Sequence, residues 1–291
     1  MKKIVIAAAV LLALSGAAAV FAEEAELLPE STLRLTIAPS FGFQVQEWEG
    51  SGDDTVMLFN TGLGLEYGVN NWLSAQVLWI PGVNAWSKLD GGKYGLFSDV
   101  FLGIKTGIIG SGAPVDNSAM RLSLAGGITA PLPSSKGSTR EGDYHLWGSV
   151  LRLYYDYIFS PLFYLNAFAE MVYFPSQRLI GPNYGTRSVN HPLDCTFELD
   201  SRFRYPLEDK GLVLHWGIPL TFRLAPWLNR NDEEYGMESA YNFSVGAFFT
   251  VTFAELKFPL DLTLRYSAPV AGQYEQPVHR VSLLGRLNFK L

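Results

Sequence analysis

The chain has 291 residues, a formal net charge of −6, an apolar fraction of 48% and an aromatic fraction of 14%. The net negative charge argues against a nucleic acid as partner. Its only apolar run of helical membrane length lies at the very start, which argues against a helical membrane protein, and its single cysteine, Cys195, excludes an intramolecular disulfide.

Residues 1–22 have the pattern of a secretory signal peptide. Two lysines precede a long apolar run, and the small-residue sequence that ends at Ala22 predicts cleavage after that residue. A membrane-anchoring helix is the alternative, but acidic residues rather than a basic stop-transfer flank follow the run. We therefore predict an exported protein.

The remainder divides into a short acidic segment at 23–30, too brief for a plug domain, and a single domain over 31–291. Throughout this domain, apolar and polar residues alternate along the chain. Every second residue is therefore of the same kind, which is the pattern of a β-strand with two different faces. Twelve segments show the alternation, in chain order 32–45, 57–67, 73–81, 96–108, 120–130, 144–157, 163–173, 193–205, 212–223, 241–251, 260–266 and 280–291.

The segment 193–205 shows the pattern most clearly. One face carries Cys195, Phe197, Leu199, Ser201, Phe203 and Tyr205, and the other carries Asp194, Thr196, Glu198, Asp200, Arg202 and Arg204. If the second face were turned toward lipid, each basic residue near the membrane midplane would destabilise the barrel by about 2 to 4 kcal/mol. We therefore predict that the apolar face meets lipid and the charged face the lumen.

The connections alternate between short turns and longer loops, the longest at 175–192 and 226–238. This alternation is typical of outer-membrane barrels. The predicted fold is all-β, a transmembrane antiparallel up-and-down β-barrel of about twelve strands, with short periplasmic turns and longer extracellular loops. A water-soluble barrel of inverted orientation is the alternative, but it would have to bury many Trp and Phe side chains.

The last strand, 280–291, has apolar residues at alternating positions up to Leu291. It resembles the assembly signal of outer-membrane barrel proteins, with Leu where Phe is usual. The resemblance implies that periplasmic chaperones and the barrel-assembly machinery are partners, together with the lipid bilayer. The oligomeric state is not predicted.

The charged residues of the lumen face are the candidate functional residues. We predict that the lumen is lined by Asp99, Lys105, Arg121, Arg152, Glu170, Asp194, Glu198, Asp200, Arg202, Arg204, Arg223, Asp261, Arg265 and Arg286. Mixed signs in a confined space favour internal ion pairs, and the functional alternative is a conduit for small solutes with a slight anion preference. Because eight-stranded barrels are filled and sixteen-stranded ones leave a wide channel, twelve strands predict a narrow, partly obstructed passage.

The sequence contains no GxSxG, HExxH or phosphate-loop motif, and we predict no enzymatic activity, cofactor or metal site. An outer-membrane lipid hydrolase of similar size is the enzymatic alternative, but the His-x-Ser-Asn-Gly pattern of the outer-membrane phospholipases is absent.

Three segments, GLGLEYGVNNWL at 62–73, SDVFLGIKTGI at 98–108 and LSLAGGITAPLPS at 122–134, resemble one outer-membrane family. It is the transporter family associated with the meta-cleavage pathway of phenol degradation, a distant relative of the FadL-type channels. The resemblance implies passage of small hydrophobic or aromatic solutes. The rival hypothesis is a surface protein without transport activity, an adhesin or structural barrel that acts through its long loops.

Overall fold

The computed structural model is a closed antiparallel β-barrel of twelve strands, which confirms the predicted fold class. The structure describes residues 25–44, 56–79, 84–87, 91–93, 99–131, 148–173, 177–181, 185–189, 193–228, 237–273 and 277–291. The barrel strands are β1 (Thr32–Gln44), β2 (Val56–Asn70), β3 (Leu73–Trp79), β6 (Asp99–Ile109), β7 (Met120–Pro131), β8 (Gly148–Ser160), β9 (Phe163–Tyr173), β12 (Leu193–Leu207), β13 (Leu212–Leu228), β14 (Met237–Phe253), β15 (Leu260–Gln273) and β16 (Val278–Lys290).

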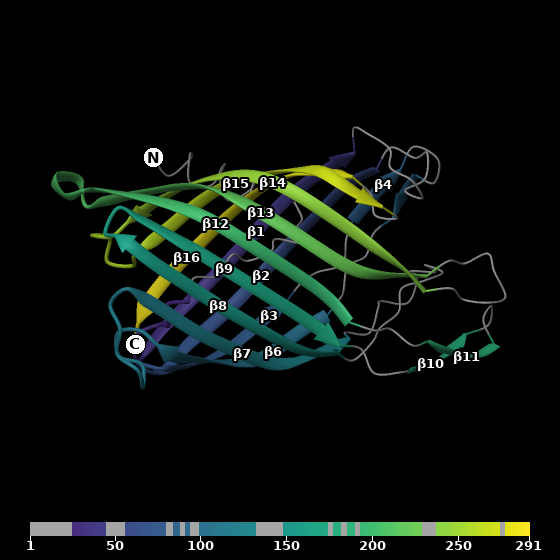
Figure 1. Ribbon diagram of the computed structural model, residues 1–291, viewed down its shortest axis with the longest axis horizontal. Helices are drawn as coiled ribbons and strands as arrows, with labels where there is room; N and C mark the ends of the chain where they lie inside the picture. The colour runs from purple at the N-terminus through teal and green to yellow at the C-terminus, as the bar shows by residue number, and fades with distance from the viewer. Residues whose placement is uncertain are drawn as a thin grey trace.

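Each of these strands pairs with the preceding barrel strand, and β1 pairs with both β2 and β16, which closes the sheet. Figure 1 shows the strands inclined to the long axis of the molecule, as barrel closure requires. The short strands β4 (Asn84–Ser87) and β5 (Gly91–Lys93) extend the sheet beside β2, while β10 (Gln177–Gly181) and β11 (Gly185–Val189) form a separate hairpin. In the part of the chain that the structure describes, no helix has the length and apolar character needed to cross a bilayer.

The barrel has two different rims. At one, which we call the short-turn rim, the connections 71–72, 110–119, 161–162, 208–211 and 254–259 join successive strands, and β1 begins where β16 ends. A 3₁₀ turn, η1 (Glu208–Lys210), forms one of these connections. The predicted signal peptide, its cleavage site after Ala22 and much of the predicted long loops lie outside the described residues.

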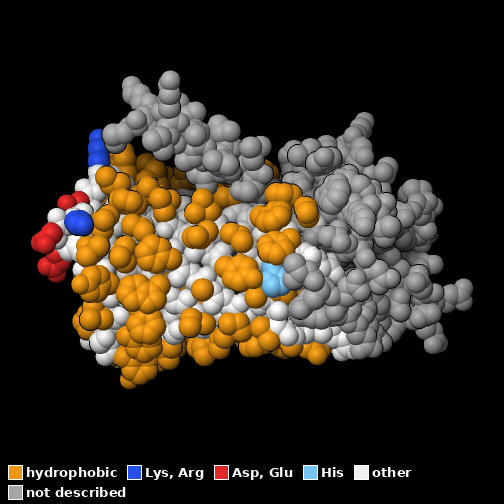
Figure 2. All heavy atoms as spheres, turned by 90° about the horizontal axis from the view of Figure 1, so that it is seen from above, with side chains coloured by type: hydrophobic (Ala, Val, Ile, Leu, Met, Phe, Trp, Pro, Cys, Tyr) orange, Lys and Arg blue, Asp and Glu red, His pale blue; other side chains and the backbone are white. Residues whose placement is uncertain are grey.

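Alternate residues of each strand point away from the lumen. Because these residues are mostly apolar, the outer wall of the barrel is apolar. Ile104, Ile218 and Leu264 expose 57, 54 and 55% of their surface, far more than a core residue would. Figure 2 shows a face covered by hydrophobic side chains, with charged side chains gathered at one end. Cys195 shares this outward parity but exposes only 7% of its surface, and its cross-strand neighbours are Met171 and Leu224.

Aromatic rings form a continuous row on this wall close to the short-turn rim. Tyr157, Phe159, Phe163, Phe203 and Trp216 contact one another in that order, with centroid distances of 4.6, 5.4, 4.9 and 5.9 Å. Amphipathic and aromatic side chains gather at the level of the lipid headgroups in membrane barrels. The row therefore has the composition and position of an aromatic girdle at one membrane interface.

Candidate functional site in the barrel interior

The interior has a filled side and an open side. On the filled side, Leu78, Phe101 and Val150 form one buried cluster. Ala125, Tyr154 and Phe168 form a second cluster together with Ala25, which belongs to the segment before β1. Apolar side chains therefore close part of the lumen, in addition to the charged ones that the sequence predicted.

Residues 25–30, which we call the N-terminal strap, lie inside the barrel. The backbone N–H of Ala25 donates to Asp156 Oδ2 (3.2 Å), its carbonyl accepts from Ser123 Oγ (2.8 Å), and the carbonyl of Glu26 accepts from Lys105 Nζ (3.1 Å). Leu28 exposes only 2% of its surface. The segment is too short to fold as a plug domain, but it occupies part of the lumen as an extended chain, a position that the sequence did not predict.

Two glycines of the wall make room for the strap. A Cβ at Gly107 would lie 2.6 Å from Leu27 Cδ1, and one at Gly68 would collide with the carbonyl oxygen of Pro29. The side chains in the strap also complement the wall, since Glu26 Oε2 lies 3.2 Å from an Arg121 guanidinium nitrogen. The strap and the wall therefore fit each other closely.

The charged residues of the filled side are held in contacts that stabilise it. Lys105 is almost fully buried, with Nζ 4.6 Å from the ring centroid of Tyr154. Arg152 donates through Nε to Glu170 Oε2 at 2.6 Å, and its guanidinium lies 4.3 Å from the centroid of Phe101. These contacts agree with the structural role that mixed charges predicted.

The open side is a cavity of about 760 Å³, enclosed mainly by β12 to β16. Its lining includes, among the described residues, eight arginines and three carboxylates: Arg34, Arg121, Arg202, Arg204, Arg223, Arg265, Arg280 and Arg286 against Glu26, Asp200 and Asp261. Threonine and serine hydroxyls fill much of the remaining wall. Most of the lining residues are therefore polar or charged. The arginines outnumber the carboxylates even when three carboxylates that pair with them from behind the lining are added, namely Glu66, Asp156 and Glu198.

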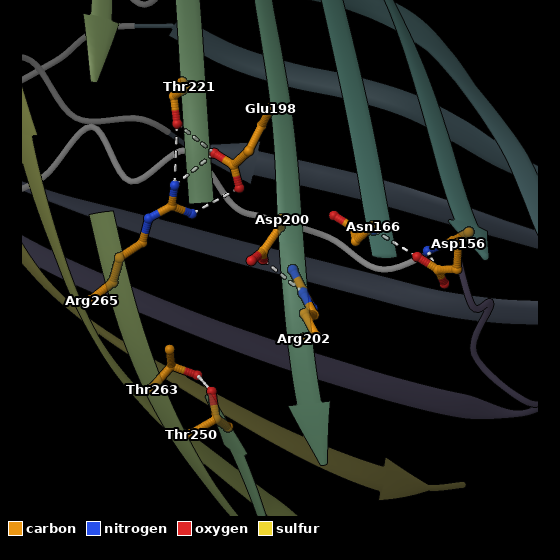
Figure 3. Close-up of polar contacts among 10 residues, drawn as sticks. Asp156, Asn166, Glu198, Asp200, Arg202, Thr221, Thr250, Thr263 and Arg265 are labelled. Carbon is orange, nitrogen blue, oxygen red and sulfur yellow. Dashed lines mark hydrogen bonds and ion pairs between the residues drawn. The ribbon is translucent and has the colours of Figure 1, made fainter. Parts of the chain in front are cut away.

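Two ion pairs lie beside one another at the cavity wall (Figure 3). Arg265 of β15 donates to both carboxylate oxygens of Glu198 of β12, at 3.0 and 2.6 Å, and Thr221 of β13 donates to the same carboxylate at 3.0 Å. Two residues along β12 from Glu198, Asp200 Oδ2 accepts a hydrogen bond of 2.8 Å from Arg202 Nε. Because β12 and β15 are not neighbours in the sheet, the first pair joins strands across the interior.

The predicted lumen residues fall into three groups. Those that line the cavity are Arg121, Asp200, Arg202, Arg204, Arg223, Asp261, Arg265 and Arg286. Those that lie inside the barrel in contacts apart from the cavity lining are Lys105, Arg152, Glu170 and Glu198. The backbones of Asp99 and Asp194 lie in β6 and β12, but their side chains lie outside the described part of the structure.

The strap was not predicted to lie in the lumen, and two aromatic side chains that line the cavity, Tyr164 and Phe248, were not among the predicted lumen residues. The strand parity contained the signal for both rings, since each stands next to an outward-facing residue of its strand. They were absent from the predicted lumen lining because that prediction named charged residues only. Among the described residues, no group of three or more His, Cys, Asp or Glu is placed to hold a metal ion.

The fold and the polar interior define the class of the protein as an outer-membrane-type β-barrel. No family model and no curated protein matches the chain. The crystal structure of an outer-membrane channel from Pseudomonas putida F1 is 15% identical, with a TM-score of 0.69 over 91% of this chain and 97% of that one.

Two further solved barrels are similar at lower scores. The β domain of the Bordetella autotransporter BrkA is 15% identical, with a TM-score of 0.49 over 90% of this chain and all of that one. A variant of the monoaromatic hydrocarbon channel TodX is 9% identical, with a TM-score of 0.45 over 95 and 96%. At these identities the likeness concerns the fold alone.

Proposed function

We propose that the protein is an outer-membrane channel for the passive passage of small solutes through a charged lumen. The observation that carries the proposal is the cavity of about 760 Å³ inside a closed barrel, with a wall of arginines, carboxylates and hydroxyls. A barrel that served only as a structural element would gain nothing from leaving this polar volume open. The solved channel from Pseudomonas putida F1 has the same fold and supports the proposal.

The dimensions of the interior limit the solute to a small molecule. At about 30 Å³ per water molecule, the cavity holds at least on the order of 25 waters, and the strap and the apolar clusters of the filled side occupy another part of the lumen. Most of the lining residues are polar or charged, and Tyr164 and Phe248 add aromatic surface. It favours polar or charged solutes over hydrocarbons, and aromatic solutes remain compatible with it when they carry a charge.

Uptake by liposomes tests the proposal. Purified protein in phospholipid vesicles should make them permeable to small sugars and organic acids, while vesicles without protein stay closed. Ser282→Trp places a bulky ring in the cavity wall, and Leu283→Trp places the same ring on the opposite, outward parity of β16. We expect the first variant to slow uptake and the second to leave it unchanged, and a wild-type protein without uptake would remove the proposal.

A further inference from the structure

Asp200 has a carboxylate oxygen that the described structure leaves unsatisfied. Its side chain is fully buried and lines the cavity, and Oδ2 accepts from Arg202 Nε at 2.8 Å. Among the described residues, Oδ1 has no hydrogen-bond donor. Leaving a buried acceptor unpaired costs about 1 to 3 kcal/mol, so the position requires a donor from outside the wall.

Among the described residues, the neighbouring strands provide no hydrogen-bond donor for Asp200 Oδ1. The cross-strand partners of Asp200 are Asn166 on β9 and Pro219 on β13. Asn166 uses its Nδ2 to donate to Asp156 Oδ1 at 2.6 Å, and its own Oδ1 also has no donor among the described residues. Pro219 has no backbone N–H to offer. Two acceptors without a donor among the described residues therefore lie on neighbouring strands, and Asp200, the one on β12, lines the cavity.

The next row of the wall holds Arg202 between two aromatic rings. Its guanidinium carbon lies 5.9 Å from the ring centroid of Tyr164 and 5.3 Å from that of Phe248. Phe248 reaches this position across Gly217, where a Cβ would lie 2.7 Å from Phe248 Cε1. The rings limit the freedom of the guanidinium and offer apolar surface beside it.

The charge of the cavity selects the kind of donor that fits. An ammonium or metal cation would satisfy Asp200 Oδ1. The eight lining arginines outnumber the carboxylates even when the three that pair with them from behind the lining are counted, and this excess of positive charge opposes entry of a cation. A neutral hydroxyl donates equally well and does not meet this barrier. If the same molecule carries a carboxylate, the arginines attract it. Arg204 follows Arg202 as the next cavity-lining residue on this face of β12.

We propose that the cavity contains a binding site for small hydroxycarboxylates. The solute hydroxyl donates to Asp200 Oδ1, the solute carboxylate lies among the arginines that include Arg204, and the carbon chain contacts Tyr164 and Phe248. This inference names the solute class of the proposed channel and therefore rests on that function.

Lactate and propionate form a matched pair of probes, because they differ by the one hydroxyl in question. In planar bilayers containing the wild-type protein in chloride solution, each anion is added and the reduction of the chloride current is measured. We expect lactate to reduce the current at a concentration about tenfold lower than propionate, the factor that a hydrogen bond to a charged acceptor gives.

Variants assign the difference to Asp200. Asp200→Ala removes the acceptor and should bring the two concentrations together, even if the released Arg202 makes both anions bind more tightly. Asp261→Asn also removes one negative charge from the lining but leaves Asp200 intact, and it should preserve the ratio.

The possible results separate the site from the channel. A channel that responds equally to lactate and propionate in the wild type overturns the site and leaves the proposed function standing, because water then satisfies Asp200. A ratio that survives in Asp200→Ala also overturns it. A protein that carries no current at all overturns both, and the wild-type comparison needs no variant to fold.

Discussion

Removal of the Glu198 carboxylate should destabilise the barrel markedly. The carboxylate is buried and accepts two hydrogen bonds from Arg265 and one from Thr221, so Glu198→Ala leaves a guanidinium in the interior without its bidentate partner. Breaking one side of a buried ion pair costs about 3 to 5 kcal/mol. Because the Arg265 side chain keeps 15% of its surface accessible, we expect the lower end, about 3 kcal/mol.

Equilibrium unfolding by guanidinium chloride in phospholipid vesicles, followed by tryptophan fluorescence, measures this change. Arg265→Ala and the double variant complete a cycle, and the double variant should cost clearly less than the sum of the single ones. Thr250→Val, which removes a hydrogen bond of 2.7 Å to Thr263 in the same wall, is a matched control and should cost about 1 kcal/mol. A loss below about 1 kcal/mol for Glu198→Ala, or strict additivity in the cycle, would refute the reasoning.

Three more variants test other parts of the structure. Leu199→Arg places a charge on the outward face next to Glu198 and should lower stability in the same assay by about 2 to 4 kcal/mol, and no loss would show that this face does not meet lipid. Deletion of residues 25–28 removes most of the strap and should raise single-channel conductance, whereas an unchanged conductance would mean that the strap does not obstruct the passage. Gly217→Val sets a Cβ against the Ser201 carbonyl and Phe248 and should cost about 1 to 3 kcal/mol, and a neutral effect would contradict the close packing of that row.

Strand parity made the wall predictable from sequence. In β12, Glu198 would cost far more free energy than Leu199 if it faced lipid, so the strand is stable in only one orientation. The same difference between the two faces fixes the orientation of the other strands. The structure accordingly places Leu199 outside and Glu198 inside. Alternation therefore predicted the fold and, in β12, the opposite faces of Glu198 and Leu199.

Contacts across the lumen were not predictable in this way. The pairing of Glu198 with Arg265 depends on which inward residues of separated strands reach each other, and this follows from barrel curvature and strand stagger rather than from local pattern. The strap entered the lumen because inward glycines such as Gly107 left room for it, and a missing side chain gives a weak signal in a sequence. The division of the interior into a filled side and a cavity could be seen only in the structure.

Single-channel recording in planar bilayers tests the central claim most directly, namely that the arginine-lined cavity of about 760 Å³ belongs to an aqueous path through the barrel. The wild-type protein should produce discrete current steps, and Ser282→Trp, which fills part of the cavity, should reduce their size. Correctly folded wild-type protein that inserts into the bilayer and gives no current steps would contradict the account.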